Sequence, residues 1–280
     1  MPASRFVSLP FAILLALFSA FATAQAQKAP AYEPSCSAAL AQDDAVVITA
    51  VRDPVQKSYR KMLDGAKRFE ERRRLAPAAS LRFKLLPRKP ETAMEGIELE
   101  VAADSLAIPL KVAPDRTFTL ERNDRARKEN ARVMPNRKAG TLTWRADVRT
   151  PGLPPSFRRL GDLRLECEVG MQSGLISNYR AGWLEKLFPE GPEYCRRERP
   201  RYLFFAERPL FGVTLVDGSR REVLSVDWLY AGATRDPEWK EDLPYCDCEA
   251  LVERAYFVPL GDESWPDDTL VVLEYMEDKP

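Results

Sequence analysis

The chain has 280 residues, with 42 basic and 42 acidic side chains and no histidine. Without histidine it lacks the usual general base near neutral pH, which excludes Ser-His-Asp and Cys-His catalysis within this chain. The balanced charge lacks the basic excess that neutralises phosphates in nucleic-acid complexes, so we expect no nucleic-acid partner.

The beginning of the chain has the pattern of a secretory signal peptide, which we assign to residues 1–26. Arg5 precedes an apolar stretch from Phe11 to Phe21, and small residues suited to cleavage follow at 22–24 and 24–26. The apolar stretch is far shorter than the roughly 20 residues that a membrane-spanning helix needs. We therefore expect an exported protein, periplasmic or secreted, whose mature chain has no transmembrane segment.

Residues 27–44 are a polar leader, and residues 45–170 are predicted to form a helix plus a β-sandwich-like domain. Ala45 to Val51 is predicted to be a buried strand. Between Tyr59 and Phe69 apolar residues recur at intervals of three and four, which is typical of an amphipathic helix. From Leu81 onward apolar residues alternate, which predicts short antiparallel strands near 81–85, 97–101, 108–112, 118–120, 141–148 and 163–169.

The remaining chain is predicted to be a connecting segment, 171–205, with a short helix around 183–188, followed by a smaller β-rich domain, 206–280. Asp217-Gly218 is typical of a hairpin turn between strands near 211–215 and 223–229. Two more strands are expected at 251–258 and 270–275. The predicted fold class is mainly β with minor α, an α+β fold, and whether the two β regions make one domain or two stays open.

The cysteines are candidates for disulfide bonds in an oxidising compartment, namely Cys36, Cys167, Cys195, Cys246 and Cys248. We expect two bridges and one spare thiol, in a pairing that sequence leaves open. The alternation around Cys167 places it in a core. A bridge within 246–248 would close a small, strained, easily reduced ring, so a redox role is one interpretation; a bond from one of the two to a distant cysteine is the favoured one. The spacing argues against zinc, and we expect no cofactor.

Paired carboxylates suggest one type of site. Glu166 and Glu168 flank Cys167 on the polar face of the strand predicted there, which would set the two side chains next to each other. Such a pair can perform acid and base steps in glycoside hydrolysis. The competing interpretation is the solvated face of a half-buried strand, with Arg164 and neighbouring arginines as partners.

Arginine and tryptophan suggest another type of site. Arg196 and Arg197 lie in a basic run, and planar guanidinium groups suit the carboxylates or phosphates of an envelope polymer. Trp239 and Trp265 lie in polar loops and are expected to be exposed for contact with a ligand. The competing interpretation of the basic run is a solvated loop that balances nearby glutamates.

Residues 106–169 include Ile-Pro-Leu at 108–110, Asp-Arg-Thr-Phe-Thr-Leu at 115–120 and Arg-Leu-Gly-Asp-Leu-Arg-Leu-Glu-Cys at 159–167. In strand spacing and in the Asp-x-x-Phe-x-Leu turn, this part resembles prealbumin-like modules of the carboxypeptidase regulatory type. The resemblance implies an accessory, noncatalytic β sandwich and assigns no functional residue. The whole chain also resembles uncharacterised exported proteins of Gram-negative bacteria, which implies a periplasmic compartment.

These features predict a noncatalytic binding or structural protein of the cell envelope, with an envelope protein or polymer as its partner. The alternative is a carboxylate-dependent periplasmic hydrolase that acts on glycans, with Glu166 and Glu168 as acid and base. The first hypothesis rests on the export signal, the missing histidine and the alternating strands, and it assigns no catalytic residue.

Overall fold

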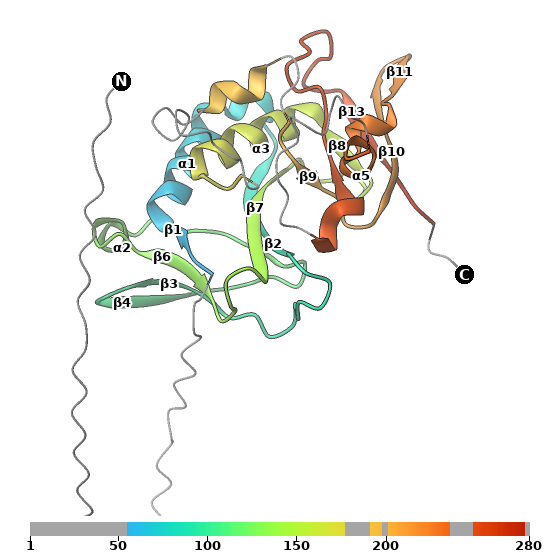
Figure 1. Ribbon diagram of the computed structural model, residues 1–280. Coiled ribbons are helices and arrows are strands. Elements are labelled where there is room, and N and C mark those ends of the chain that lie inside the picture. The colour runs from blue at the N-terminus through green and yellow to red at the C-terminus, as the bar shows by residue number, and fades with distance from the viewer. Residues whose placement is uncertain (1–54, 177–190, 198–200, 236–248, 278–280) are drawn as a thin grey trace, which may run out of the picture. The chain divides into compact units, whose positions relative to one another are not determined.

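The computed structural model describes residues 55–176, 191–197, 201–235 and 249–277 (Figure 1), all within one compact unit, Thr49–Pro280. The predicted strand at 45–51 and the short helix around 183–188 lie outside the described residues. So do Cys36, Cys246, Cys248 and Trp239. Among the described helices, none combines the length and apolar character needed to cross a membrane.

The fold is mainly β and antiparallel with a few helices, which confirms the predicted class. One sheet has the order β1 (Lys57–Ser58), β6 (Arg132–Pro135), β3 (Leu99–Ala103), β4 (Leu106–Leu110). A second has the order β5 (Thr117–Phe118), β2 (Ser80–Pro87), β7 (Leu142–Arg149). A third has the order β11 (Arg220–Val223), β10 (Leu210–Asp217), β13 (Leu270–Tyr275), β8 (Phe157–Arg159), and β12 (Ala255–Tyr256) pairs with β9 (Phe204–Phe205).

The helices are α1 (Tyr59–Glu71), α2 (Asp124–Lys128), α3 (Leu160–Ser173) and α5 (Tyr230–Ala233). Short 3-10 turns occur at η1 (Arg73–Leu75), η2 (Pro192–Arg196), η3 (Val226–Trp228) and η4 (Glu249–Arg254). Helices α1 and α3 lie side by side next to the sheet that contains β2 and β7 (Figure 1).

Helix α1 is the amphipathic helix that the sequence predicts. Ser58 caps its start, because the side-chain oxygen accepts a hydrogen bond from the Lys61 amide. One face, with Tyr59, Met62 and Phe69, is buried in the core, while the basic residues between them face outward. The packing of this apolar face therefore fixes how the helix docks.

Strands β2 and β7 follow the predicted alternation. Phe83 and Leu85 are buried on one face of the pair, and opposite them in the register lie Ala146 and Trp144, which are also buried. The residues between them, among them Arg82 opposite Asp147, occupy the other face. This side of the sheet is therefore charged, as expected for a strand pair with a single apolar face.

Helix α3 occupies the residues predicted to be a strand at 163–169, so that prediction is wrong. The apparent alternation comes from two helical faces. Leu160, Leu163 and Cys167 belong to one core cluster, while Leu165 and Val169 belong to another. Because α3 is buried on nearly all sides, it lacks the polar stripe by which a surface helix is recognised in a sequence.

The C-terminal predictions are confirmed in part. The hairpin at Asp217-Gly218 joins β10 to β11, with Gly218 at φ 58°, and β13 covers the strand predicted at 270–275. The strand predicted at 223–229 is wrong beyond its first residue, because Val223 is the last residue of β11 and the chain then turns into η3. In the strand predicted at 251–258, the first half belongs to η4 and only Ala255–Tyr256 forms a strand. Short apolar runs do not distinguish a strand from a single helical turn.

Three buried carboxylates lie on α3, and each has partners. Asp162, Glu166 and Glu168 are at most 5% exposed. Their partners are Thr150 for Asp162, Arg158 for Glu166, and Arg68 with Arg72 for Glu168. Because a buried carboxylate without a partner would be very costly, these contacts fix the helix relative to α1, β7 and β8.

Strand β7 lies at the edge of its sheet, and charged side chains bind its outward backbone groups. The Val148 amide donates to Glu166 at 3.0 Å, and the Val148 carbonyl accepts from Arg158 at 2.8 Å. Further along the strand, Lys57 Nζ donates to the Trp144 carbonyl at 3.1 Å. Side chains thus supply hydrogen bonds that a neighbouring strand would otherwise make.

Gly161, at the start of α3, allows two other segments to approach closely. A Cβ atom at this position would lie 2.0 Å from the Leu75 carbonyl oxygen and 2.9 Å from Cβ of Asp267. We expect Gly161→Ala to lower the free energy of unfolding by about 1–3 kcal/mol, because the added methyl group meets backbone that cannot rotate away. Urea denaturation measures this change.

Gly191→Ala is the matched control. Gly191 has φ −89°, and a Cβ atom there would meet no heavy atom of the described residues within 4 Å. This variant should keep the wild-type stability to within about 0.5 kcal/mol. Equal stability of both variants would contradict the close approach at Gly161.

The pKa of Lys57 lies far below the ordinary value of a lysine. Burial, with the charges of Arg145 and Arg88, lowers its pKa from 10.5 to about 7. Between about pH 7 and pH 10.5 the unfolded chain therefore binds more protons at this site than the folded one, so folding stability should rise with pH across that window.

We expect Lys57→Met to flatten this rise, because methionine keeps the apolar stem and does not titrate. The measurement is the free energy of unfolding by urea between about pH 7 and pH 10, compared with that of Lys111→Met, which alters an exposed lysine. Tyr202 and Tyr256, whose pKa burial raises to about 12, are shared by all three proteins, so their contribution cancels in the comparison. A slope for Lys57→Met that equals the wild-type slope would contradict the lowered pKa.

Candidate functional site

A cavity of about 650 Å³ lies over the charged face of β2 and β7. We call it the first cavity. Ser80, Arg82 and Lys84 of β2 and Asp147 and Arg149 of β7 line it. The remaining wall consists of residues 114–117, Leu153, Pro155 and Glu207. Its volume is in the range of small-molecule binding sites.

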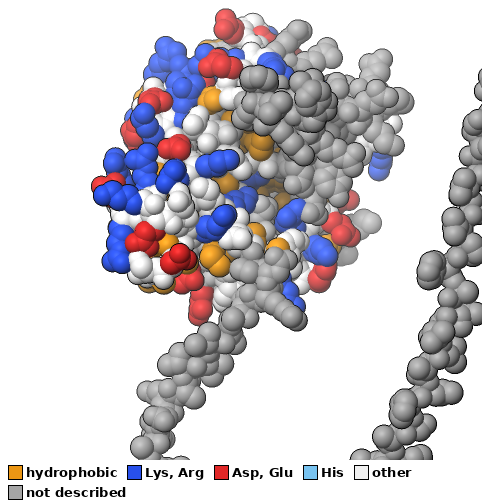
Figure 2. Space-filling view, turned by 60° about the vertical axis from the view of Figure 1, so that its left-hand side comes forward, with side chains coloured by type: hydrophobic (Ala, Val, Ile, Leu, Met, Phe, Trp, Pro, Cys, Tyr) orange, Lys and Arg blue, Asp and Glu red, His pale blue; other side chains and the backbone are white. Residues whose placement is uncertain are grey.

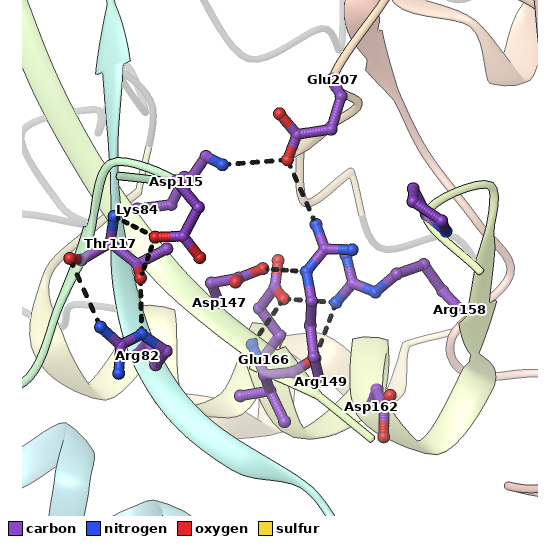
Figure 3. A network of polar contacts seen from close by, with 12 residues as sticks. Arg82, Lys84, Asp115, Thr117, Asp147, Arg149, Arg158, Asp162, Glu166 and Glu207 are labelled. Carbon is purple, nitrogen blue, oxygen red and sulfur yellow. Dashed lines mark hydrogen bonds and ion pairs between the residues drawn. The ribbon is translucent and has the colours of Figure 1, made fainter. Parts of the chain in front are cut away.

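Glu207 closes one side of the first cavity by bridging two basic residues (Figure 3). Its carboxylate accepts from Lys84 Nζ at 3.0 Å and lies 3.8 Å from the Arg149 guanidinium. Arg149 also pairs with Asp147 at 2.8 Å. Lys84 and Arg149 are therefore held in place by carboxylates, with their remaining N–H donors open to further acceptors.

Arg82 lies on the opposite side and bonds only neutral groups among the described residues. Its Nε donates to Thr117 Oγ1 and its Nη2 to the Thr117 carbonyl (Figure 3). Thr117 Oγ1 in turn donates to Asp115 at 2.7 Å. Burial favours a higher pKa for Asp115, but hydrogen bonds from Thr117 and the charges of Lys84 and Arg82 outweigh it and hold the pKa below its ordinary value. Asp115 is thus an anion that orients the turn.

Arg116, which lines the first cavity, has a backbone conformation that arginine seldom adopts. Its φ is 64°, in the left-handed region, and the turn is closed by hydrogen bonds between Ala113 and both Arg116 and Thr117. The side chain is exposed, and no carboxylate among the described residues pairs with it. Non-glycine residues in this region concentrate at functional sites, where the strain is compensated elsewhere.

The buried ion pair of Glu166 and Arg158 binds the backbone of β7, the strand whose charged face lines the first cavity. The two side chains meet at 2.7 Å, both nearly fully buried, next to β7 (Figure 3). Burial raises the pKa of Glu166, with the positive charge of Arg158 opposing that shift. Neither residue lines the first cavity, so the pair positions β7 and does not contact a ligand there.

The lining of the first cavity has a small excess of positive charge. Four basic side chains and three acidic ones line it: Arg82, Lys84, Arg116 and Arg149 against Asp115, Asp147 and Glu207. An excess of one positive charge, with Arg82 and Arg116 free of carboxylate partners in the described part of the chain, favours a carboxylate or phosphate group as the ligand. Among the described residues no cluster of three or more acidic, cysteine or histidine side chains could hold a metal ion.

The structure separates the two glutamates that the sequence analysis placed side by side. Two residues apart on a helix, Glu166 and Glu168 point to different neighbours, the first to Arg158 and the second to Arg68 and Arg72. Both are buried, so the expected solvated strand face is also wrong. Of the arginine partners that the competing interpretation expected, a neighbouring one, Arg158, does pair with Glu166, whereas Arg164 pairs with Asp267.

A second cavity, of about 490 Å³, contains several of the predicted residues. Arg196, Trp265, Cys195 and Glu168 all line it. Trp265 is only 1% exposed and lies under the Arg220 guanidinium, 3.5 Å from its ring centroid, so the expected exposure for contact is wrong. The polar loop around the indole folds back over it, which a loop composition does not reveal.

The remaining predicted residues are Arg197 and the described cysteines. Arg197 lies next to the second cavity but outside its lining, with its guanidinium over the Tyr194 ring at 5.3 Å. Cys167 and Cys195 form a disulfide bond across 28 residues, which confirms a structural bridge and the core position of Cys167.

Sequence reasoning missed the residues of the first cavity. Arg82 and Lys84 are polar positions of an alternating strand, a pattern that predicts only a solvated face. Glu207 comes from a distant loop. The available signal was the pair of acidic and basic side chains, Asp115 and Arg116, in the turn before β5.

The buried pair at Glu166 gives a stability prediction. Glu166→Gln removes the charge opposite Arg158 and leaves a buried guanidinium without its carboxylate, so we expect a loss of about 3–5 kcal/mol in unfolding free energy. Glu207→Gln is the control, since its ion pairs are half-exposed and should contribute about 0–1 kcal/mol. Urea denaturation measures both. A loss at Glu166 as small as that at Glu207 would show that the pair does not stabilise the fold.

No family model, no curated protein and no solved structure matches the chain. The resemblance of residues 106–169 to prealbumin-like modules therefore stays a prediction, and function has to be argued from the chemistry of the cavities.

Proposed function

We propose that the protein is an exported, noncatalytic binding protein of the cell envelope that holds a carboxylate or phosphate group in the first cavity. The observation that carries this proposal is the set of four basic residues around one cavity, two of which have no carboxylate partner among the described residues. Hydrogen bonds from guanidinium groups to oxyanions are strong and directional, so such a cavity selects its ligand by charge and by shape.

One face of the molecule carries charge of both signs. On the face drawn in Figure 2, basic and acidic side chains are interspersed and hydrophobic ones are scattered, outside the grey atoms. A broad contact driven by apolar burial would need a contiguous hydrophobic patch.

Two observations support export. The first 26 residues have the signal-peptide pattern, and Cys167 forms a disulfide with Cys195. Stable disulfides are typical of compartments outside the cytoplasm. An anionic envelope polymer or protein would be available to the protein there.

The alternative, a hydrolase that acts on glycans, has less support. It needs two carboxylates that face one substrate from about 5 to 10 Å apart. Glu166 lines neither of the two cavities, whereas Glu168 lines the second and is tied to arginines. We therefore retain the binding protein as the proposed function.

Arg116 offers a sharp test, because ligand binding and stability should respond in opposite directions. Glycine adopts the left-handed conformation without strain, so Arg116→Gly should raise the free energy of unfolding by about 0.5–1 kcal/mol. Loss of one charged donor should weaken the binding of inorganic phosphate or citrate about tenfold or more. Isothermal titration calorimetry and urea denaturation measure the two effects.

Asn130→Gly is the matched control. Asn130 also has a positive φ, 53°, but it does not line the first cavity, so this variant should change stability with no effect on anion binding. If Arg116→Gly binds phosphate and citrate as tightly as Asn130→Gly does, or if the wild type binds neither, the proposed function is wrong.

A further inference from the structure

The second cavity lies at the end of α1, beside α3, η2 and the loop 260–267. Its charged lining consists of Arg72, Arg74, Arg164 and Arg196 against Glu168, Glu263 and Asp267. None of these residues lines the first cavity, so a ligand site here is independent of the proposed function.

Three guanidinium groups converge on the single buried carboxylate of Glu168. Its Oε2 accepts from Arg68 at 2.8 Å and from Arg72 at 3.0 Å, and its Oε1 lies 3.4 Å from Arg196. Of the other carboxylates near these arginines, Glu193 is 74% exposed and contributes little in water. Around Glu168 itself, positive charge is therefore in excess.

Arg74 and Arg196 have donors available at this cavity. Arg74 is exposed, lines the cavity and pairs with no carboxylate among the residues that the structure describes. Arg196 is 47% exposed and reaches Glu168 with one nitrogen and Glu193 with the other. Arg164, by contrast, is occupied by Asp267 and by three backbone carbonyls. The positive charge open to a ligand therefore lies on the η1 and η2 side.

The position of Arg196 is fixed from two directions. The disulfide joins Cys167 to Cys195, and the residues that follow these cysteines, Glu168 and Arg196, are the two that meet in the cavity. On the other side, a Cβ atom at Gly261 would lie 1.9 Å from the Arg197 carbonyl oxygen and 2.7 Å from that of Arg196. The loop 260–267 thus packs directly against the backbone that carries this arginine.

We propose that the second cavity is a binding site for a phosphoryl group, with Arg74 and Arg196 as its ligand-contacting residues and the disulfide as the element that positions Arg196. A phosphoryl group carries about two negative charges near neutral pH and three acceptor oxygens, which match several guanidinium donors at once. The cavity volume of 490 Å³ leaves room for the rest of a phosphorylated molecule or for a lipid headgroup.

The test uses the full-length mature protein and inorganic phosphate as the probe, in an Arg82→Gln/Arg116→Gln background that weakens the first cavity. We expect Arg74→Gln/Arg196→Gln to weaken phosphate binding at least tenfold in calorimetry. The control is Arg73→Gln/Arg197→Gln, which removes the two neighbouring arginines, whose guanidinium groups stack on Phe69 and Tyr194 outside the lining. Binding that is unchanged by the first pair, or weakened equally by both pairs, would overturn the site.

Two further arms define its chemistry. Cys167→Ala/Cys195→Ala should weaken phosphate binding several-fold, and unchanged affinity in that folded variant would overturn the positioning role of the disulfide. If the variant fails to fold, the two arginine pairs still decide the site. Binding to vesicles that contain phosphatidic acid, absent with phosphatidylcholine alone, would identify a lipid headgroup as the source of the phosphoryl group. Binding of free phosphate without vesicle binding would identify a soluble phosphorylated ligand, and binding of neither would overturn the proposal.

Discussion

The pairing of buried carboxylates on α3 with cationic partners from other elements is the interaction on which the rest of the structure depends. A charged helix can lie in a protein interior only if each charge is paired or hydrogen-bonded, since a buried ion without a partner is too costly. Glu166 connects α3 to β8 through its ion pair with Arg158, and Glu168 connects α3 to α1 through Arg68 and Arg72. Both cavities adjoin these pairs: the first lies above the Glu166 pair, and Glu168 lines the second. The same ion pairs therefore stabilise the fold and support the cationic walls of the two cavities.

Much of the fold could be predicted from the sequence wherever one face of an element is solvated. Helix α1 and strands β2 and β7 each have one apolar and one polar side, so their periodicity is visible in the residues. Helix α3 could not be predicted in this way. Its two apolar faces pack against different core clusters and its acidic residues are buried. The usual contrast between a buried apolar face and a solvated polar face is therefore missing from its sequence.

The candidate sites were less accessible to sequence reasoning, because they are formed by distant segments. Arg196 could be proposed from the chemistry of guanidinium groups alone, and it does line a cavity. Trp265 could not be judged from its polar loop, since Arg220 and the surrounding chain cover the ring. The pairing of Cys167 with Cys195 was one of several arrangements, and only the fold brings these two sulfurs together.

The edge of β7 has a consequence for the behaviour of many copies of this chain in one solution. Exposed strand edges are templates on which a second molecule can add a strand, the first step toward intermolecular sheets and aggregates. Here Lys57, Glu166 and Arg158 already bind the outward backbone groups at Trp144 and Val148. An incoming strand would have to displace paired, desolvated ions to dock at these positions. The ion pair thus also blocks strand addition at this edge of the sheet.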